Sequence, residues 1–313
     1  MQSITQKYSP FPTALLPGQL DNGKDYFILF GTALNLPELT DFQEKCGRNF
    51  VIFDCWRIGE NTVVLLQGRF ERCYVEYAHA LRLDAALIDF NARLSQPGLL
   101  VMDMDSTAIK IECIDEIAKL AGTGDEVSAI TAAAMRGELD FEQSLRRRVA
   151  TLKGASEQIL SRVRERLPLM EGLRETVAAL KQQNWKVAIA SGGFTYFADY
   201  LKEMLALDAA VSNQFEIIDG KLTGRLKGDI VHAQYKANTL KLLAQEFGVD
   251  LQNTVAIGDG ANDLVMMSAA DLGAAFHAKP KVQQQAQVMV NFADLTGLLC
   301  LLSANDKVQR LKN

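Results

Sequence analysis

The sequence lacks an apolar run long enough to cross a bilayer, which argues against a membrane-spanning protein. It also lacks a long basic run, and its net charge of −5 argues against a nucleic-acid-binding protein. Only three histidines are present and no two have ligand spacing, so a histidine-based zinc site is not expected. The first 17 residues show no secretory signal, and the five scattered cysteines include no C-x-x-C pair, as in a reduced, cytoplasmic protein. Acid–base chemistry is therefore expected from carboxylates.

What the sequence does contain is enough apolar material for two domains, with 48% hydrophobic residues in a chain of 313. Residues 1–25 are rich in proline and glycine and predict an irregular arm. The segment 26–95 then predicts a small α+β domain, because strand and helix patterns alternate as β-α-β-β-α-β, the ferredoxin-like order. Packing or homodimerisation accounts for such a domain at least as readily as regulation does. Residues 96–313 form the second predicted domain.

The second domain opens on a short apolar run, 99–102, that predicts a buried strand. The run ends in Asp103 and Asp105, whose i, i+2 spacing puts both side chains on one face of an extended chain. Two adjacent carboxylates repel each other and need a cation or a shared proton. Mg²⁺ fits, because it prefers oxygen ligands and keeps positions for phosphate and water. A lone Asp-x-Asp is more often a solvated strand end, so further evidence is required.

Residues 113 to about 170 then read as helices throughout, an insert typical of a lid over an α/β core. After the insert, strands at 185–190, 253–257 and 272–276 alternate with helices, and Asp219-Gly220 predicts the turn of a hairpin within 209–230. This alternation predicts a doubly wound parallel sheet, whose ligands bind at the carboxyl ends of the strands.

Three more polar clusters fall at such positions. Ser191-Gly192 offers a hydroxyl and bare backbone N–H groups at the junction of a strand and a helix. Lys236 begins a helix and offers an ammonium for phosphate. Residues 258–263 read Gly-Asp-Gly-Ala-Asn-Asp, whose acids suit a metal ion. Each cluster alone is weak evidence, but their combination on an α/β pattern is improbable by chance.

Together these clusters resemble the four motifs of the haloacid dehalogenase superfamily of phosphohydrolases. The resemblance is closer still to the branch that acts on phosphoserine, because Glu112 and the sequence Ile-Asp-Glu-Ile-Ala at 114–118 match that branch, as does the cap stretch 134–149. Met104 replaces the Phe of many relatives, a change expected to be neutral. The motifs cover roughly 98–300, and bacterial members often carry an amino-terminal extension resembling an ACT domain, in agreement with the first predicted domain.

The resemblance implies Mg²⁺-dependent hydrolysis of O-phospho-L-serine through an aspartyl-phosphate, the last step of serine synthesis. Asp103 would be the nucleophile and Asp105 the general acid and base. Mg²⁺ would lie between Asp103, the backbone carbonyl of Asp105, and Asp259. Asp263 would support these ligands from behind, and direct ligation of the ion by Asp263 is the alternative.

The implied substrate contacts divide by the groups of phosphoserine. Phosphate oxygens would meet Ser191, the Gly192 N–H, Lys236 and Asn262. Glu112 would meet the ammonium and Arg148 the carboxylate, while Met135 and Phe141 would form a dry wall of the lid. Taken alone, Arg148 reads as a surface cation and the two apolar residues as helix core.

Three other functions stay open. The first is a phosphatase of the same family for another small phosphomonoester, which would not need both Glu112 and Arg148. The second is a phosphatase whose N-terminal domain mainly senses an amino acid. The third, a dehalogenase, is disfavoured because its chemistry needs neither Asp105 nor the metal site.

Overall fold

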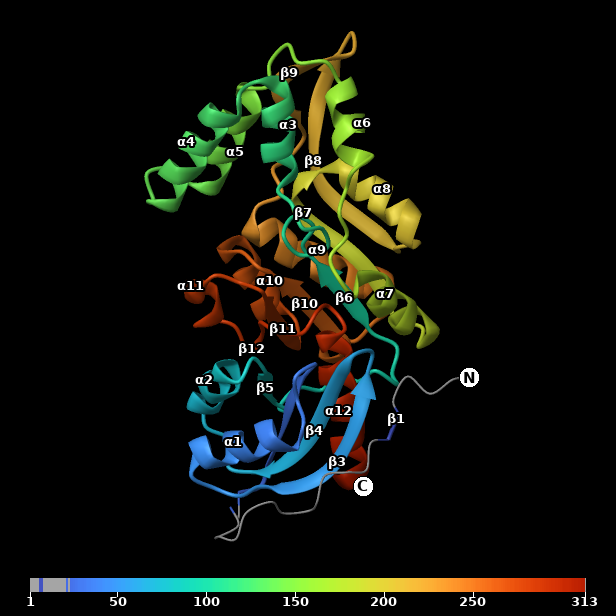
Figure 1. Ribbon diagram of the computed structural model, residues 1–313. Helices are drawn as coiled ribbons and strands as arrows, with labels where there is room; N and C mark the ends of the chain where they lie inside the picture. The colour runs from blue at the N-terminus through green and yellow to red at the C-terminus, as the bar shows by residue number, and fades with distance from the viewer. Residues whose placement is uncertain (1–5, 8–20, 22, 313) are drawn as a thin grey trace.

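The computed structural model describes residues 6–7, 21 and 23–312. Within these residues two separate sheets form, and a group of helices stands at the far side of the larger sheet (Figure 1). Most of the arm predicted for residues 1–25 lies outside the described part, although Gln6–Lys7 forms β1. No helix among the described residues has both the length and the hydropathy needed to cross a bilayer. The limits given above for the domains stay predictions.

The N-terminal sheet is antiparallel in the order β1-β3-β4-β2-β5. Leaving out β1, this is the strand order of a ferredoxin-like unit, so the predicted α+β fold is confirmed. Helix α1 ends at Gly47, whose positive φ of 64° allows the left-handed cap. The elements are β2 (Asp25–Gly31), α1 (Leu36–Cys46), β3 (Val51–Ile58), β4 (Asn61–Gly68), α2 (Cys73–Ala80) and β5 (Asp84–Leu87).

Both faces of this sheet are covered. Helices α1 and α2 pack on one face around buried aromatic rings, among them Phe27, Phe50 and Tyr74. The other face receives α12 (Gly297–Lys312), a helix more than 200 residues later in the sequence (Figure 1). Trp56 Nε1 donates to Ser303 Oγ of α12 at 3.1 Å. The two domains therefore share one continuous apolar core.

The larger sheet has the order β12-β11-β10-β6-β7-β8-β9, parallel except for β9. Strand β6 lies between β10 and β7, so the chain order reverses there, and such a reversal creates a crevice at the carboxyl ends of the strands. All four residues of β6 are buried, which explains their unbroken apolar run. The strands are β6 (Leu99–Met102), β7 (Lys186–Phe194), β8 (Ala209–Ile218), β9 (Lys221–Lys227), β10 (Thr254–Gly258), β11 (Leu272–Phe276) and β12 (Val288–Val290).

Helices flank this sheet and form the lid. The predicted all-helical insert is present as α3 to α6, inserted between β6 and α7 (Figure 1). The insert consists of α3 (Cys113–Ala121), α4 (Gly124–Met135), α5 (Phe141–Ala150) and α6 (Gln158–Arg164). The core helices are α7 (Leu173–Gln182), α8 (Thr195–Leu205), α9 (Ala233–Glu246), α10 (Leu264–Ala269) and α11 (Pro280–Gln283), with short 3₁₀ turns at Leu251–Asn253 and Ala261–Asp263.

The predicted hairpin is formed by β8 and β9, and it does more than close the sheet. Asp219 and Gly220 both have positive φ, 48° and 69°, as a tight hairpin turn requires. Beyond the sheet, the hairpin reaches the lid, where Gly154 N donates to Leu222 O at 2.8 Å and Leu222 N donates to Ala155 O at 2.9 Å. The lid is thus attached to the core by backbone hydrogen bonds as well as by its two connecting segments.

Candidate active site

The loop after β6 is fixed by backbone hydrogen bonds. The N–H of Asp103 donates to Ile257 O of β10 at 3.0 Å, so this residue is still held by the sheet. The Oδ1 atom of Asp103 accepts the Met104 N–H at 2.7 Å. The Met104 carbonyl in turn accepts the N–H groups of Ala108 and Ile109, which folds the chain into a compact turn. The carboxylate of Asp103 is therefore held in one orientation at the carboxyl end of the central strand.

Lys236 is the cation of this site, and its side chain is fully buried. Its Nζ lies 2.9 Å from Asp103 Oδ1 and 2.8 Å from Asp263 Oδ1. Burial alone would lower the pKa of Lys236, but the charges of the two carboxylates outweigh burial and raise it. The side chain of His232 caps α9 by accepting the Tyr235 N–H at 3.3 Å, which is a structural role.

Asp263 is held from both sides by the chain itself. Its Oδ1 accepts from Lys236, and its Oδ2 accepts the Gly260 N–H at 3.0 Å. A Cβ atom at Gly258 would lie 2.4 Å from the Asp263 carboxyl carbon, so this loop requires glycine there. Because both carboxylate oxygens already have partners, Asp263 is suited to supporting neighbouring groups.

Three carboxylates gather at this end of the sheet. One oxygen each from Asp103, Asp259 and Asp263 lies within 4.8 Å of the others. Burial and the nearby negative charge of Asp103 raise the pKa of Asp259 and of Asp263 to about 7. Such repulsion is relieved by a cation, and an all-oxygen donor set is the one that hard divalent ions prefer. The residues present therefore fit a metal ion.

Asp105 lies beside this cluster and has different partners. Its Oδ1 accepts the Cys113 N–H at 3.3 Å, and the Cys113 thiol is hydrogen-bonded to the same carboxyl. Burial, followed by the charges of Glu112 and Asp103, raises the pKa of Asp105 well above its usual range. A carboxyl that keeps its proton near neutral pH can serve as a general acid. Cys113 is a buried thiol, and it contacts the carboxyl predicted to move protons.

The predicted anion-binding groups, Ser191 and the Gly192 N–H, lie at the end of β7. The Ser191 hydroxyl accepts the Gly193 N–H at 3.0 Å, and the carbonyl of Gly192 accepts from Asn213 Nδ2 at 2.8 Å. A Cβ atom at Gly192 would lie 2.7 Å from the Phe141 ring of the lid. Glycine is thus needed at this position for two reasons. It lets the lid approach the core closely, and it exposes a backbone N–H.

The lid side of the site carries the predicted substrate contacts. Glu112 Oε1 accepts from the Ser106 hydroxyl at 2.9 Å. Arg148 extends from α5, and its buried Nε has no hydrogen-bond partner among the described residues. A buried donor without a partner is costly and indicates that an acceptor belongs there. The charge of Glu112 acts on Arg148, so the two predicted recognition groups are neighbours.

A cavity of about 430 Å³ collects these residues. Of the twelve predicted site residues, ten line it, and the other two, Lys236 and Asp263, lie buried behind Asp103. The sequence reading missed further wall residues, notably Lys279, Lys281 and Val282. These follow β11, and the rule that ligands bind at the carboxyl ends of parallel strands would have pointed to them.

Comparisons with known proteins agree with this geometry. A family model described as haloacid dehalogenase-like hydrolase matches residues 98–271. The chain belongs to the haloacid dehalogenase-like hydrolases. A second model, described as a domain of unknown function (DUF5609), matches residues 23–87. The family resemblance and the fold class predicted from the sequence are both confirmed for this hydrolase.

Two relatives of this haloacid dehalogenase-like hydrolase match almost its whole length, and a third matches about two thirds of it. The phosphoserine phosphatase of Haemophilus influenzae is 64% identical over 309 residues, which is 98% of each chain. The crystal structure of a probable phosphoserine phosphatase from Vibrio cholerae superposes with a TM-score of 0.87 at 52% identity, covering 98% of this chain and 96% of that one. A substrate-bound phosphoserine phosphatase complex has a TM-score of 0.62 at 41% identity and covers 65% of this chain and 98% of that one.

Proposed function

We propose that this hydrolase converts phosphoserine into serine and inorganic phosphate. The identity to proteins named phosphoserine phosphatases supports this substrate and does not favour another phosphomonoester. The observation that carries the mechanism is the position of Asp103, whose Oδ1 is held by the Met104 N–H and by Lys236. A carboxylate held in this way is a nucleophile with a fixed direction of approach.

In the first step, an Asp103 oxygen attacks phosphorus and the bond from phosphorus to the serine oxygen breaks. Asp105 gives its proton to that serine oxygen, for which its raised pKa is suited. In the second step, water attacks the aspartyl-phosphate while Asp105 takes a proton from it. Phosphate leaves, and both carboxyl groups return to their starting forms.

A metal ion belongs to this chemistry, and we expect Mg²⁺. When bound, it neutralises negative charge on the phosphoryl group. Asp103, Asp259 and the backbone carbonyl of Asp105 would hold it, while Asp263 keeps Lys236 and the Gly260 N–H in place. Phosphate oxygens would be bound by Lys236, Ser191, the Gly192 N–H and Asn262. This anion-binding site would be buried and partly preformed.

Recognition of serine itself falls to the lid. Arg148 would bind the carboxylate of the substrate through its two-pronged guanidinium, and its unpartnered Nε supports this role. Glu112 would bind the ammonium. Met135 and Phe141 line the same cavity and would exclude water from the reacting phosphorus.

We infer a cytoplasmic enzyme from the scattered thiols. A homodimer through the N-terminal domain is a further proposal. Because both faces of that domain's sheet are covered, a partner would have to meet its helices or an edge strand. Sedimentation of the purified protein measures this assembly.

The test of the activity is phosphate release from L-phosphoserine, a sugar phosphate and phosphothreonine, each with Mg²⁺ and with EDTA. We expect selective turnover of L-phosphoserine that needs Mg²⁺ and disappears in Asp103→Asn. Equal or better turnover of the sugar phosphate would leave the chemistry standing but would overturn the roles of Glu112 and Arg148. Turnover by Asp103→Asn at the wild-type rate would overturn the nucleophile.

A further inference from the structure

One wall of the active-site cavity comes from α11 and the residues just before it. Lys279, Lys281 and Val282 line the cavity together with residues of the lid and of the other strand ends. Both lysines are exposed, and within the described residues neither forms an ion pair with a carboxylate. The other charged residues that line the cavity are four acidic residues and Arg148. Lys279 and Lys281 are therefore the cations that this wall contributes to the cavity.

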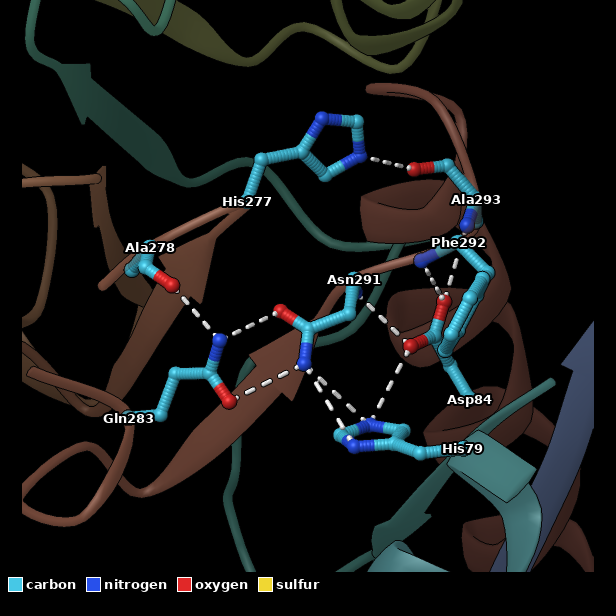
Figure 2. A network of polar contacts seen from close by, with 8 residues as sticks. All are labelled: His79, Asp84, His277, Ala278, Gln283, Asn291, Phe292 and Ala293. Carbon is cyan, nitrogen blue, oxygen red and sulfur yellow. Dashed lines mark hydrogen bonds and ion pairs between the residues drawn. The ribbon is translucent and has the colours of Figure 1, made fainter. Parts of the chain in front are cut away.

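This segment is held at both of its ends by polar contacts (Figure 2). At the start, His277 has a positive φ of 45°, and its Nε2 lies 2.9 Å from Ala293 O. At the end, Gln283 Nε2 donates to Ala278 O at 2.6 Å and to Asn291 Oδ1 at 3.1 Å. Asn291 Nδ2 returns a hydrogen bond to Gln283 Oε1 at 3.1 Å. The paired amides fix α11 against the chain that follows β12.

The same stretch of chain is held by the N-terminal domain. Asp84 of β5 has no exposed surface, and it accepts three consecutive backbone N–H groups across the domain boundary (Figure 2). The donors are Asn291 at 2.7 Å, Phe292 at 3.0 Å and Ala293 at 2.8 Å. His79 of α2 lies 3.4 Å from Asn291 Nδ2 through its Nε2. A buried carboxylate with three donors is strongly oriented, so it holds the backbone of residues 291–293 against β5.

A second contact joins the N-terminal domain to the end of α11. Arg72 Nη2 donates to the carbonyl of Gln284 at 2.5 Å. The wall is therefore attached to the N-terminal domain directly through Arg72 and indirectly through Asp84, Asn291 and Gln283.

We propose that the N-terminal domain positions this wall of the active site, and that Lys279 and Lys281 draw the anionic substrate into the cavity. The inference rests on the proposed function, because it concerns the entry of a phosphate ester with a free carboxylate. Through these contacts the N-terminal domain acts on substrate binding rather than on the chemical step.

The physical reason is long-range attraction. The dianionic substrate must approach a cavity lined by the carboxylates of Asp103, Glu112 and Asp259, which repel it, and Arg148, Lys236 and a bound Mg²⁺ would offset only part of this barrier. The two lysines near α11 reduce this barrier. Because both are exposed, they act on the substrate through solvent, and their effect weakens as the salt concentration rises. The chemical step is untouched, because Asp103 and Lys236 are held by β6, β10 and α9 and not by α11.

The first experiment measures steady-state turnover of L-phosphoserine by the double variant Lys279→Gln/Lys281→Gln. We expect kcat/KM to fall about fivefold at low ionic strength with kcat unchanged, and the difference to vanish at high salt. Lys241→Gln, on α9 and outside the cavity lining, is the matched control and should behave as wild type. An unchanged kcat/KM in the double variant would overturn the proposal.

The second experiment tests the attachment with Gln283→Leu. We expect a fall in kcat/KM of about threefold with kcat unchanged. The same substitution in the background of Lys279→Gln/Lys281→Gln should have no further effect, because the groups it positions are gone. Equal effects in both backgrounds, or a lower Tm with unchanged kcat/KM, would overturn positioning by the N-terminal domain. Failure of the wild type to hydrolyse phosphoserine would instead overturn the proposed function.

Discussion

Lys236 and Asp263 form an ion pair in which neither side chain has exposed surface, with Nζ and Oδ1 2.8 Å apart. The same ammonium holds Asp103, so one buried cation contacts both the proposed nucleophile and the loop after β10. A buried charge that loses its partner is much more costly than an exposed one. The stability of the core and the activity of the site therefore depend on the same atom.

Replacing this cation tests that dependence. We expect Lys236→Met to lower turnover by at least about 10²-fold, since the phosphate and the nucleophile lose their common partner. Stability should fall by about 3 kcal/mol at pH 7, because two buried carboxylates are left uncompensated. Phosphate release and urea unfolding measure the two effects. Lys241→Met, on the exposed side of the same helix, is the control. Normal activity in Lys236→Met would contradict the assignment.

The contact between Gly192 and Phe141 predicts a specific steric effect. We expect Gly192→Ala to raise KM and lower kcat, together by about tenfold or more in kcat/KM, because the new Cβ would lie 2.7 Å from the ring. Adding Phe141→Leu should recover part of the loss by removing the ring. If the double variant is worse than the single one, the loss arises from the backbone and not from the lid.

Cys113 predicts a difference between two variants of similar size. Its thiol and its N–H both hydrogen-bond Asp105, and the side chain is fully buried. Cys113→Val keeps the volume but removes the side-chain donor, so we expect kcat to fall about tenfold with little change in KM. Cys113→Ser keeps a donor and should retain most of the turnover. Equal kcat in both variants would show that the side chain only fills space.

The burial of His79 predicts a pH-dependent stability. Burial lowers the pKa of His79, although the charges of Asp84 and Glu76 oppose this. The unfolded chain thus binds this proton more tightly than the folded chain does, so stability is lost as pH falls from about 6.5 through the lower folded-state pKa. We expect urea unfolding between pH 7.5 and 5.5 to show a smaller loss of stability in His79→Gln than in wild type. Parallel curves would contradict this role.

Trp56 predicts how strongly the domains depend on each other. Its ring is buried against α12 and lies under Lys307 Nζ, 4.6 Å from the ring centre. Trp56→Ala should cost about 3–5 kcal/mol in the free energy of unfolding, with kcat unchanged for the folded enzyme. Leu242→Ala, at an exposed position, should change stability by no more than about 0.5 kcal/mol. A small effect of Trp56→Ala would mean that the N-terminal domain is held by other contacts.

The catalytic half of the molecule could be predicted because its chemistry is local in sequence. Asp103 and Asp105 are two residues apart, and each further cluster follows directly on a strand, so a parallel sheet brings them together. The strand at 272–276, for example, has in the structure the bounds that the sequence predicts. The positions of such strands and helices follow from the periodicity of apolar residues, which can be read directly from the sequence.

What could not be predicted depends on contacts between distant parts of the chain. The packing of α12 on the N-terminal sheet and the hydrogen bonds from Asp84 to the chain after β12 leave no local pattern. Lys279 and Lys281 resemble ordinary surface lysines until the fold turns their segment toward the cavity. The lid contact of the β8–β9 hairpin was missed for the same reason.

The joint between the first sheet and α12 also bears on how the protein is made. Trp56 and its partner Ser303 are 247 residues apart, so a ribosome has released the whole first sheet long before the helix that covers it exists. At a synthesis rate of about 5–20 residues per second, the apolar face of the sheet stays uncovered for more than about ten seconds during translation. Chaperones that bind nascent chains would meet this face first, and the emergence of α12 would release them.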